Sequence, residues 1–139
     1  MWMFSVGYRG FAFLRTIPTD AMLVEVTGQQ WVWTFRYPDS GVTSNEMVVP
    51  VAKAIHVELT SPEEDVIHSF FLPHFRLKQD AMPGRRIPVW FEATQTGEFE
   101  IPCAELCGFG HSGMKGLLVV HTPDEYQKWY REKSAGSGA

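Results

Sequence analysis

The sequence has little cysteine, no excess of positive charge and no long hydrophobic run. Two cysteines in 139 residues are too few for a domain held together by disulfides. Twelve Lys and Arg against sixteen Asp and Glu give a net charge of −4, which argues against a nucleic-acid-binding protein. The sequence is rich in hydrophobic residues, which make up 45% of the chain, and aromatic residues alone make up 14%. This is enough for the core of one folded domain.

No segment is a complete membrane span, which would need about 20 apolar residues. The most apolar stretch, residues 1–14, is interrupted by Gly7, Arg9 and Gly10 and has neither the basic segment nor the cleavage site of a signal peptide. Two interpretations stay open for this N-terminal arm, residues 1–19. It covers part of a β-domain, or it is the end of a membrane helix that continues outside this chain.

Short β-rich runs separated by Pro and Gly begin at Met22 and predict an all-β sandwich or barrel. The expected strands are residues 22–27, 31–37, 54–61, 66–72, 86–92, 97–101 and 117–121. One helix is expected to follow Thr122, because Pro123 suits its first turn and Glu125 completes a capping box. The predicted domain is residues 20–133, and the final SAGSGA, residues 134–139, is expected to be a flexible tail.

Residues 102–114, PCAELCGFGHSGM, hold the side chains that point to chemistry. They bring Cys103, Cys107, His111 and Met114 within twelve residues, and three glycines among them allow the backbone to fold tightly. Thiolate, imidazole and thioether are soft ligands that favour copper over hard cations. The predicted strands on either side would hold such a loop at one end of a sandwich.

Four kinds of site are compatible with this spacing. A Cys103–Cys107 disulfide leaves His111 and Met114 unexplained, and a structural zinc site leaves Met114 unexplained. A mononuclear blue-copper site leaves one cysteine over. Two thiolates bridging two copper ions use every residue if a second histidine comes from elsewhere, and spacing alone does not choose between His68 and His74.

These motifs resemble the CuA domain of subunit II of haem–copper cytochrome c oxidases. The family pattern Cys-x-Glu-x-Cys-x-x-x-His-x-x-Met is matched by Cys103, Glu105, Cys107, His111 and Met114. Three further blocks match in order: Gly28, Gln30, Trp31 and Trp33; Asp65, Val66, His68, Ser69 and Phe70; and Leu77, Lys78, Asp80, Ala81, Pro83, Gly84 and Arg85. The second of these selects His68 over His74.

The resemblance implies a cupredoxin-like Greek-key β-sandwich with a short C-terminal helix, and a dinuclear copper centre. Cys103 and Cys107 would bridge two copper ions, and His68 and His111 would bind one ion each. The weak axial ligands would be the side chain of Met114 and the backbone carbonyl of Glu105. An apolar shell of Phe70, Phe71, Leu106 and Phe109 would limit access of water to the ions.

The resemblance also implies a function and partners. The domain would accept electrons from cytochrome c through Trp31 and pass them to haem in subunit I of a proton-translocating oxidase, on the periplasmic side of a bacterial membrane. In the family the Glu105 carboxylate faces a magnesium site at subunit I. A missing N-terminal anchor would explain residues 1–14, and the tail would suit a linker to a fused cytochrome c domain.

Charge gives a separate indication of a partner. Residues 36–65 carry Asp39, Glu46, Glu58, Glu63, Glu64 and Asp65 against only Arg36 and Lys53. Two interpretations stay open: this excess forms a solvated acidic surface, or it forms a docking face for a basic cytochrome c near Trp31, steered by opposite charge. Competing functions are the CuA domain of a nitrous oxide reductase, a structural zinc module and a copper-delivery protein.

Overall fold

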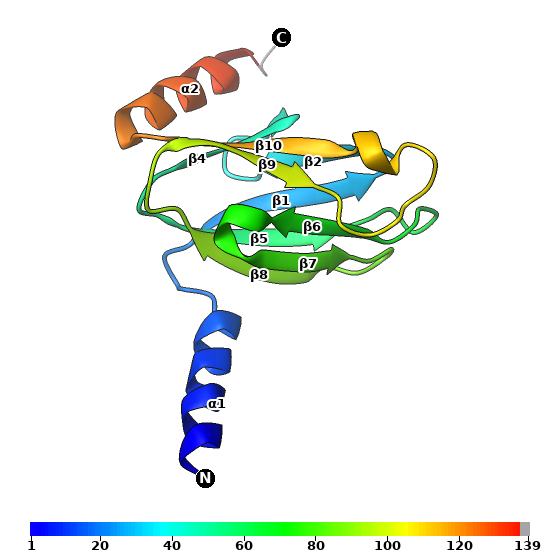
Figure 1. The fold of residues 1–139 in the computed structure, drawn as a ribbon. Helices are drawn as coiled ribbons and strands as arrows, with labels where there is room; N and C mark the ends of the chain where they lie inside the picture. The colour runs from blue at the N-terminus through cyan, green and yellow to red at the C-terminus, as the bar shows by residue number, and fades with distance from the viewer. Residues whose placement is uncertain (137–139) are drawn as a thin grey trace.

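The fold was examined in a computed structural model, which describes residues 1–136. Ten strands lie between two helices (Figure 1). The strands are β1 (Met22–Gln29), β2 (Val32–Tyr37), β3 (Val42–Ser44), β4 (Glu46–Pro50), β5 (Ala54–Thr60), β6 (His68–Leu72), β7 (Leu77–Ala81), β8 (Ile87–Glu92), β9 (Gly97–Pro102) and β10 (Lys115–His121). The helices are α1 (Trp2–Arg15) and α2 (Pro123–Gly136), with 3-10 turns η1 (Pro73–Phe75) and η2 (His111–Gly113).

The strands form a sandwich. One sheet has the order β3-β2-β1-β5-β8, and the second has the order β4-β10-β9. Strands β6 and β7 pair with each other, and a bridge between Phe70 and Cys103 connects β6 to the residue that follows β9. The chain passes repeatedly from one sheet to the other, which makes β1 parallel to β5 and β4 parallel to β10. The predicted all-β sandwich with a C-terminal helix is confirmed.

Alternation along the strands builds the core. On β5, Ile55, Val57 and Leu59 are completely buried and face the interior, as their spacing of two residues requires. The facing sheet supplies Met47, Val49 and Leu118 to the same cluster, and Phe70 enters it from β6. Because residues from all three sheets share one core, the position of β6 is fixed against both layers.

Helix α2 begins where the sequence predicts a helix, and it docks on the sandwich. The side chain of Glu125 accepts hydrogen bonds from the N–H and hydroxyl of Thr122, and the N–H of Glu125 donates to the Thr122 hydroxyl, which is the expected capping box. Tyr126 is buried, and Trp129 packs edge-on against Tyr37 with ring centroids 5.2 Å apart.

The prediction of a flexible tail is wrong for residues 134–136, because α2 continues through Gly136. Within this last part of the helix, the hydroxyl of Ser134 donates to the carbonyl of Tyr130 one turn earlier. Residues 137–139, the rest of the predicted tail, lie outside the described residues.

The N-terminal arm is helical and projects away from the sandwich (Figure 1). No residue of α1 is buried, so the interpretation of an arm that covers the β-domain is wrong. Its end is held by β8, where the indole N–H of Trp90 donates to the carbonyl of Leu14 and Phe13 packs edge-on against the Trp90 ring. Among residues 1–136, no helix has the length and apolar character needed to cross a membrane.

Candidate metal centre

The candidate site lies in the loop of residues 103–114, which joins β9 to β10 at one end of the sandwich (Figure 1). Backbone hydrogen bonds hold both ends of this 103–114 loop. The N–H of Cys103 donates to the carbonyl of Met114 at 3.0 Å, and the N–H of Ala104 donates to the carbonyl of Ser69 at 3.0 Å. The second bond places Cys103 directly beside β6, the strand that begins with His68.

Tight turns fold the second half of the loop back on the first. The N–H of His111 donates to the carbonyl of Gly108, and the N–H of Met114 donates to the carbonyl of His111. Gly108 has a φ of +120°, a backbone conformation that glycine adopts far more easily than other residues. The turns return both His111 and Met114 to Cys107.

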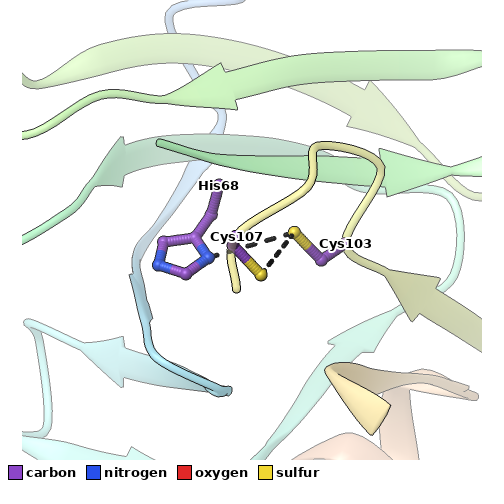
Figure 2. Close-up of side chains that lie close together, drawn as sticks. All are labelled: His68, Cys103 and Cys107. Atoms are coloured by element: carbon purple, nitrogen blue, oxygen red, sulfur yellow. Dashed lines mark hydrogen bonds between the residues drawn. The ribbon is translucent and has the colours of Figure 1, made fainter. Parts of the chain in front are cut away.

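The two cysteine thiols meet at the centre of the site (Figure 2). Their Sγ atoms are 3.8 Å apart, well beyond the roughly 2.05 Å of a disulfide bond, so both cysteines are free. Two sulfurs bound to one shared ion at about 2.3 Å each can be separated by up to about 4.6 Å. The separation therefore suits two thiolates that bridge a metal and excludes the disulfide alternative in this structure.

Two imidazole nitrogens face the sulfurs, one at each cysteine. Nδ1 of His68 lies 3.9 Å from Sγ of Cys103, and Nδ1 of His111 lies 3.4 Å from Sγ of Cys107. His68 is completely buried, and its ligand atom and the two sulfurs lie within 4.8 Å of one another, close enough to hold a metal ion (Figure 2).

The two weaker ligand candidates also reach the sulfurs. Sδ of Met114 lies 3.7 Å from Sγ of Cys107, and the backbone carbonyl oxygen of Glu105 lies 3.3 Å from Sγ of Cys103. The Glu105 residue itself is exposed, so its carboxylate belongs to the surface. The donor set is soft and almost entirely buried, which fits copper better than a hard cation.

The remaining histidines lie elsewhere. His74, which spacing alone could not separate from His68, is exposed in η1 and packs against the ring of Phe99 at 5.2 Å.

The two tryptophans of the β1–β2 region have different environments. Trp31 precedes β2 and is 41% exposed, whereas Trp33 is 1% exposed and packs edge-on against the His68 ring at 6.2 Å. The indole N–H of Trp31 donates to the backbone carbonyl of Cys107 at 3.2 Å. A surface indole is thereby connected directly to a residue of the metal centre, whereas Trp33 belongs to the core.

The predicted apolar shell around the site is only partly confirmed, because two of its four residues are exposed. Phe70 is buried and Phe71 is half-buried, but Leu106 is 79% exposed and Phe109 is fully exposed. Both side chains belong to the 103–114 loop, whose inner surface is taken up by the ligand candidates. They therefore project outward beside Trp31 and form an apolar rim around the site instead of a lid over it.

One acidic residue assigned to the docking face is also placed differently. The Asp65 side chain is 8% exposed, and its Oδ1 lies 3.5 Å from Nε2 of His68. Burial raises the pKa of this carboxyl, but hydrogen bonds from the N–H groups of Val66 and Gln30, together with His68, outweigh it and leave the pKa below its usual value. Asp65 is therefore a charged neighbour of His68 rather than part of an exposed face.

Sequence reasoning missed one contact at the site. Nε2 of Gln30 donates to the backbone carbonyl of Cys107 at 2.8 Å, beside the bond from Trp31. Gln30 stands in one of the family blocks, but the spacing of residues gives no signal that a glutamine 77 positions away reaches the loop.

We expect Gly110→Ala to destabilise the site and Gly113→Ala to be tolerated. A Cβ at Gly110 would stand 2.4 Å from Cδ2 of Trp31, whereas a Cβ at Gly113 meets no atom within 4 Å. The Trp31 indole must leave the loop and lose its bond to the Cys107 carbonyl, at a cost of about 1–3 kcal/mol. Urea unfolding of the metal-free variants measures this difference, and equal stability of the two would contradict the packing described here.

The Cys107 thiol is expected to titrate at high pH in the metal-free protein. Burial, with a hydrogen bond to the Cys103 thiol, raises the pKa of Cys107 to about 11. The folded state thus holds this proton more tightly than the unfolded state, so the stabilising contribution is present below the unfolded pKa of about 8.5 and is lost as the pH rises toward 11.

The rate of alkylation of Cys107 in the metal-free wild-type protein, followed as a function of pH with the labelled cysteine identified by peptide mass spectrometry, tests this raised pKa. The inflection should lie well above that of the same protein in urea. An unshifted inflection in the folded protein would refute the buried, protonated thiol.

Comparison with known proteins gives one family. A match to "Cytochrome C oxidase subunit II, periplasmic domain" covers residues 41–122. Cytochrome c oxidase subunit 2 of Thermostichus vulcanus is 46% identical over 115 residues, which are 82% of this chain and 34% of that protein. The corresponding protein of Synechocystis is 44% identical over 110 residues, 79% of this chain and 32% of that protein. The chain thus spans about a third of the length of these relatives.

A solved structure agrees in fold. The crystal structure of the periplasmic domain of subunit II of cytochrome oxidase from Bradyrhizobium japonicum superposes with a TM-score of 0.81 at 36% identity, covering 87% of this chain and 99% of that one. This similarity confirms the cupredoxin-like fold class. The sequence match, the shared fold and the cluster of soft ligands agree, and the chain belongs to the family of cytochrome c oxidase subunit II periplasmic domains.

Proposed function

We propose that this domain is the electron-accepting part of a terminal oxidase and holds a dinuclear copper centre. The observation that carries the proposal is the pairing of each thiol with its own imidazole across a sulfur–sulfur distance of 3.8 Å. Two thiolates shared by two ions, with one histidine for each ion, use this arrangement completely. A single zinc ion could take both cysteines and both histidines but would leave the Met114 thioether without a role, and a single blue-copper ion would leave one cysteine unused.

Each residue has a definite task in this proposal. Cys103 and Cys107 would bridge the two ions, while His68 and His111 would bind one ion each. Met114 and the Glu105 carbonyl would complete the set as weak ligands. When bound, the copper pair would supply one-electron redox chemistry shared over two ions.

The protein would keep the geometry of the centre constant during electron transfer. His68 and Met114 are almost completely buried, and both ends of the 103–114 loop are fixed by backbone hydrogen bonds. Pre-formed ligands need little rearrangement, which favours fast electron transfer. Because the Cys107 thiol is protonated at neutral pH in the metal-free protein, loading with copper should release protons.

The route of the electron would begin at Trp31. Its exposed indole is hydrogen-bonded to the backbone of Cys107, and the exposed side chains of Leu106 and Phe109 lie on the same loop. Electrons would arrive from cytochrome c, either soluble or fused to the parent chain, and pass to haem in subunit I. The chain would thus be one component of a proton-translocating cytochrome c oxidase and would not reduce oxygen itself.

The other parts of the chain would fit the same assembly. Helix α1 would be the end of a membrane anchor, which agrees with its many exposed apolar side chains. The domain would then stand on the periplasmic side of a bacterial membrane. The exposed Glu105 carboxylate would be free to meet a magnesium ion at the boundary with subunit I. The relatives named above favour this oxidase over a nitrous oxide reductase.

Copper loading tests the centre. The purified domain should bind about two copper ions per chain and give a paramagnetic resonance spectrum with hyperfine splitting shared over both nuclei. Cys107→Ser should lose the shared spectrum and His68→Ala should damage it. His74→Ala, a control at an exposed histidine 5.2 Å from Phe99, should leave it unchanged. One copper per chain, or tight zinc without colour, would reject the dinuclear centre.

Salt dependence tests the docking of a basic cytochrome c. Among the acidic residues predicted for docking, Glu64 is exposed and shares a surface depression with Gln30, the residue before Trp31. The association rate should fall steeply with added salt, and Glu64→Gln should lower it at low salt. As a control, Glu98→Gln removes one negative charge at the end of β9 that lies away from the 103–114 loop, and it should have little effect on the association rate. A rate insensitive to salt would contradict electrostatic docking.

A further inference from the structure

The turn between β1 and β2 lies between the two segments that carry the ligand candidates. Gln30, in this turn, forms a hydrogen bond to each of the two segments. Its main-chain N–H donates to Oδ2 of Asp65 at 3.0 Å, three residues before His68, and its side-chain Nε2 donates to the carbonyl of Cys107 at 2.8 Å. One residue of the turn thus connects the His68 segment to the 103–114 loop.

The carbonyl of Cys107 is held from two directions. It accepts the side-chain N–H of Gln30 and the indole N–H of Trp31, and a carbonyl oxygen has two lone pairs, so both are used. The orientation of the peptide unit that follows Cys107 is therefore fixed. Cys107 itself is 2% exposed, and the hydrogen bond that its carbonyl accepts from Gln30 is partly buried.

The turn also packs closely against the loop, in addition to its hydrogen bonds. A Cβ at Gly108 would stand 3.0 Å from Nε2 of Gln30 and 3.3 Å from the Trp31 ring. A side chain at Gly108 would crowd the Gln30 amide, so the loop and the turn are in close contact at this point. This packing is an observation independent of the hydrogen bond.

We propose that Gln30 is a positioning residue of the metal centre. Its side chain fixes the Cys107 backbone, and with it the place of the Cys107 sulfur relative to Cys103, while its main chain joins the loop to the segment that carries His68. The proposal rests on the function proposed above, because it assigns a task to Gln30 in holding the same centre.

Substitution of Gln30 separates its two bonds. Gln30→Leu keeps the main-chain N–H to Asp65 and a side chain of similar size, but it removes the donor to Cys107. Gln30→Glu keeps the shape of the side chain and, when ionised, has no N–H to donate. Trp31 still holds the carbonyl in both variants, so the loop is expected to loosen without unfolding. Loss of an outer partner of a metal ligand commonly costs about 10–100-fold in metal affinity.

The experiment compares the wild-type domain with Gln30→Leu, Gln30→Glu and, as the matched control, Gln29→Leu at the exposed neighbouring position. Each is loaded with copper, and three quantities are measured: the rate of copper release to a chelator, the hyperfine pattern and the reduction potential. Both Gln30 variants should release copper about 10-fold faster and show an altered hyperfine pattern, and the control should match the wild type. Unchanged release and an unchanged spectrum in both Gln30 variants would overturn the proposal.

Hydrogen exchange of the metal-free proteins tests the role of Gln30 without copper loading. The amides of residues 108–114 should exchange faster in both Gln30 variants, while the amides of β1 and β5 stay protected. Equal protection of the loop in all four proteins would overturn the role of Gln30. A wild-type domain that fails to bind two coppers would contradict the proposed function alone, because the exchange comparison would still stand.

Discussion

The candidate metal centre depends on the backbone bonds that tie the base of the 103–114 loop to its neighbours. The bond from Cys103 to Met114 closes the loop, and the bond from Ala104 to Ser69 attaches it to β6. The second bond holds the cysteine end of the loop against β6, the strand that begins with His68. Strand β6 is in turn held by Phe70 in the common core, so the relative position of the two ligand segments follows from packing of the whole sandwich.

The fold and the centre of the site could largely be predicted from the sequence because their signals are local. Alternation identified β5, the capping box identified the start of α2, and the ligand spacing grouped Cys103, Cys107 and His111. Strand β7 was missed because Lys78, Gln79 and Asp80 give it no apolar alternation. Strands β3 and β4 were missed because they are short and β4 ends in a proline. These strands are specified by the partners they pair with.

What could not be predicted is the direction in which loop side chains point. Hydrophobic character suggested that Leu106 and Phe109 shield the site, yet both are exposed because the loop turns its ligand candidates inward. Negative charge suggested that Asp65 belongs to a surface, yet it lies against His68. The hydrogen bond from Gln30 to Cys107 could not be predicted from the sequence either, since it joins residues far apart in the chain. Each of these depends on tertiary geometry rather than on residue type.

The exposed apolar rim of the 103–114 loop also affects how the isolated chain behaves in solution. Trp31, Leu106 and Phe109 expose apolar surface at one end of the sandwich, and α1 exposes a second apolar surface that is rich in aromatic residues. Surfaces of this kind are normally covered by a partner and otherwise favour self-association. A net charge of −4 opposes this only weakly in physiological salt. Uncovered contact surfaces therefore limit the solubility of the isolated chain before the stability of its fold does.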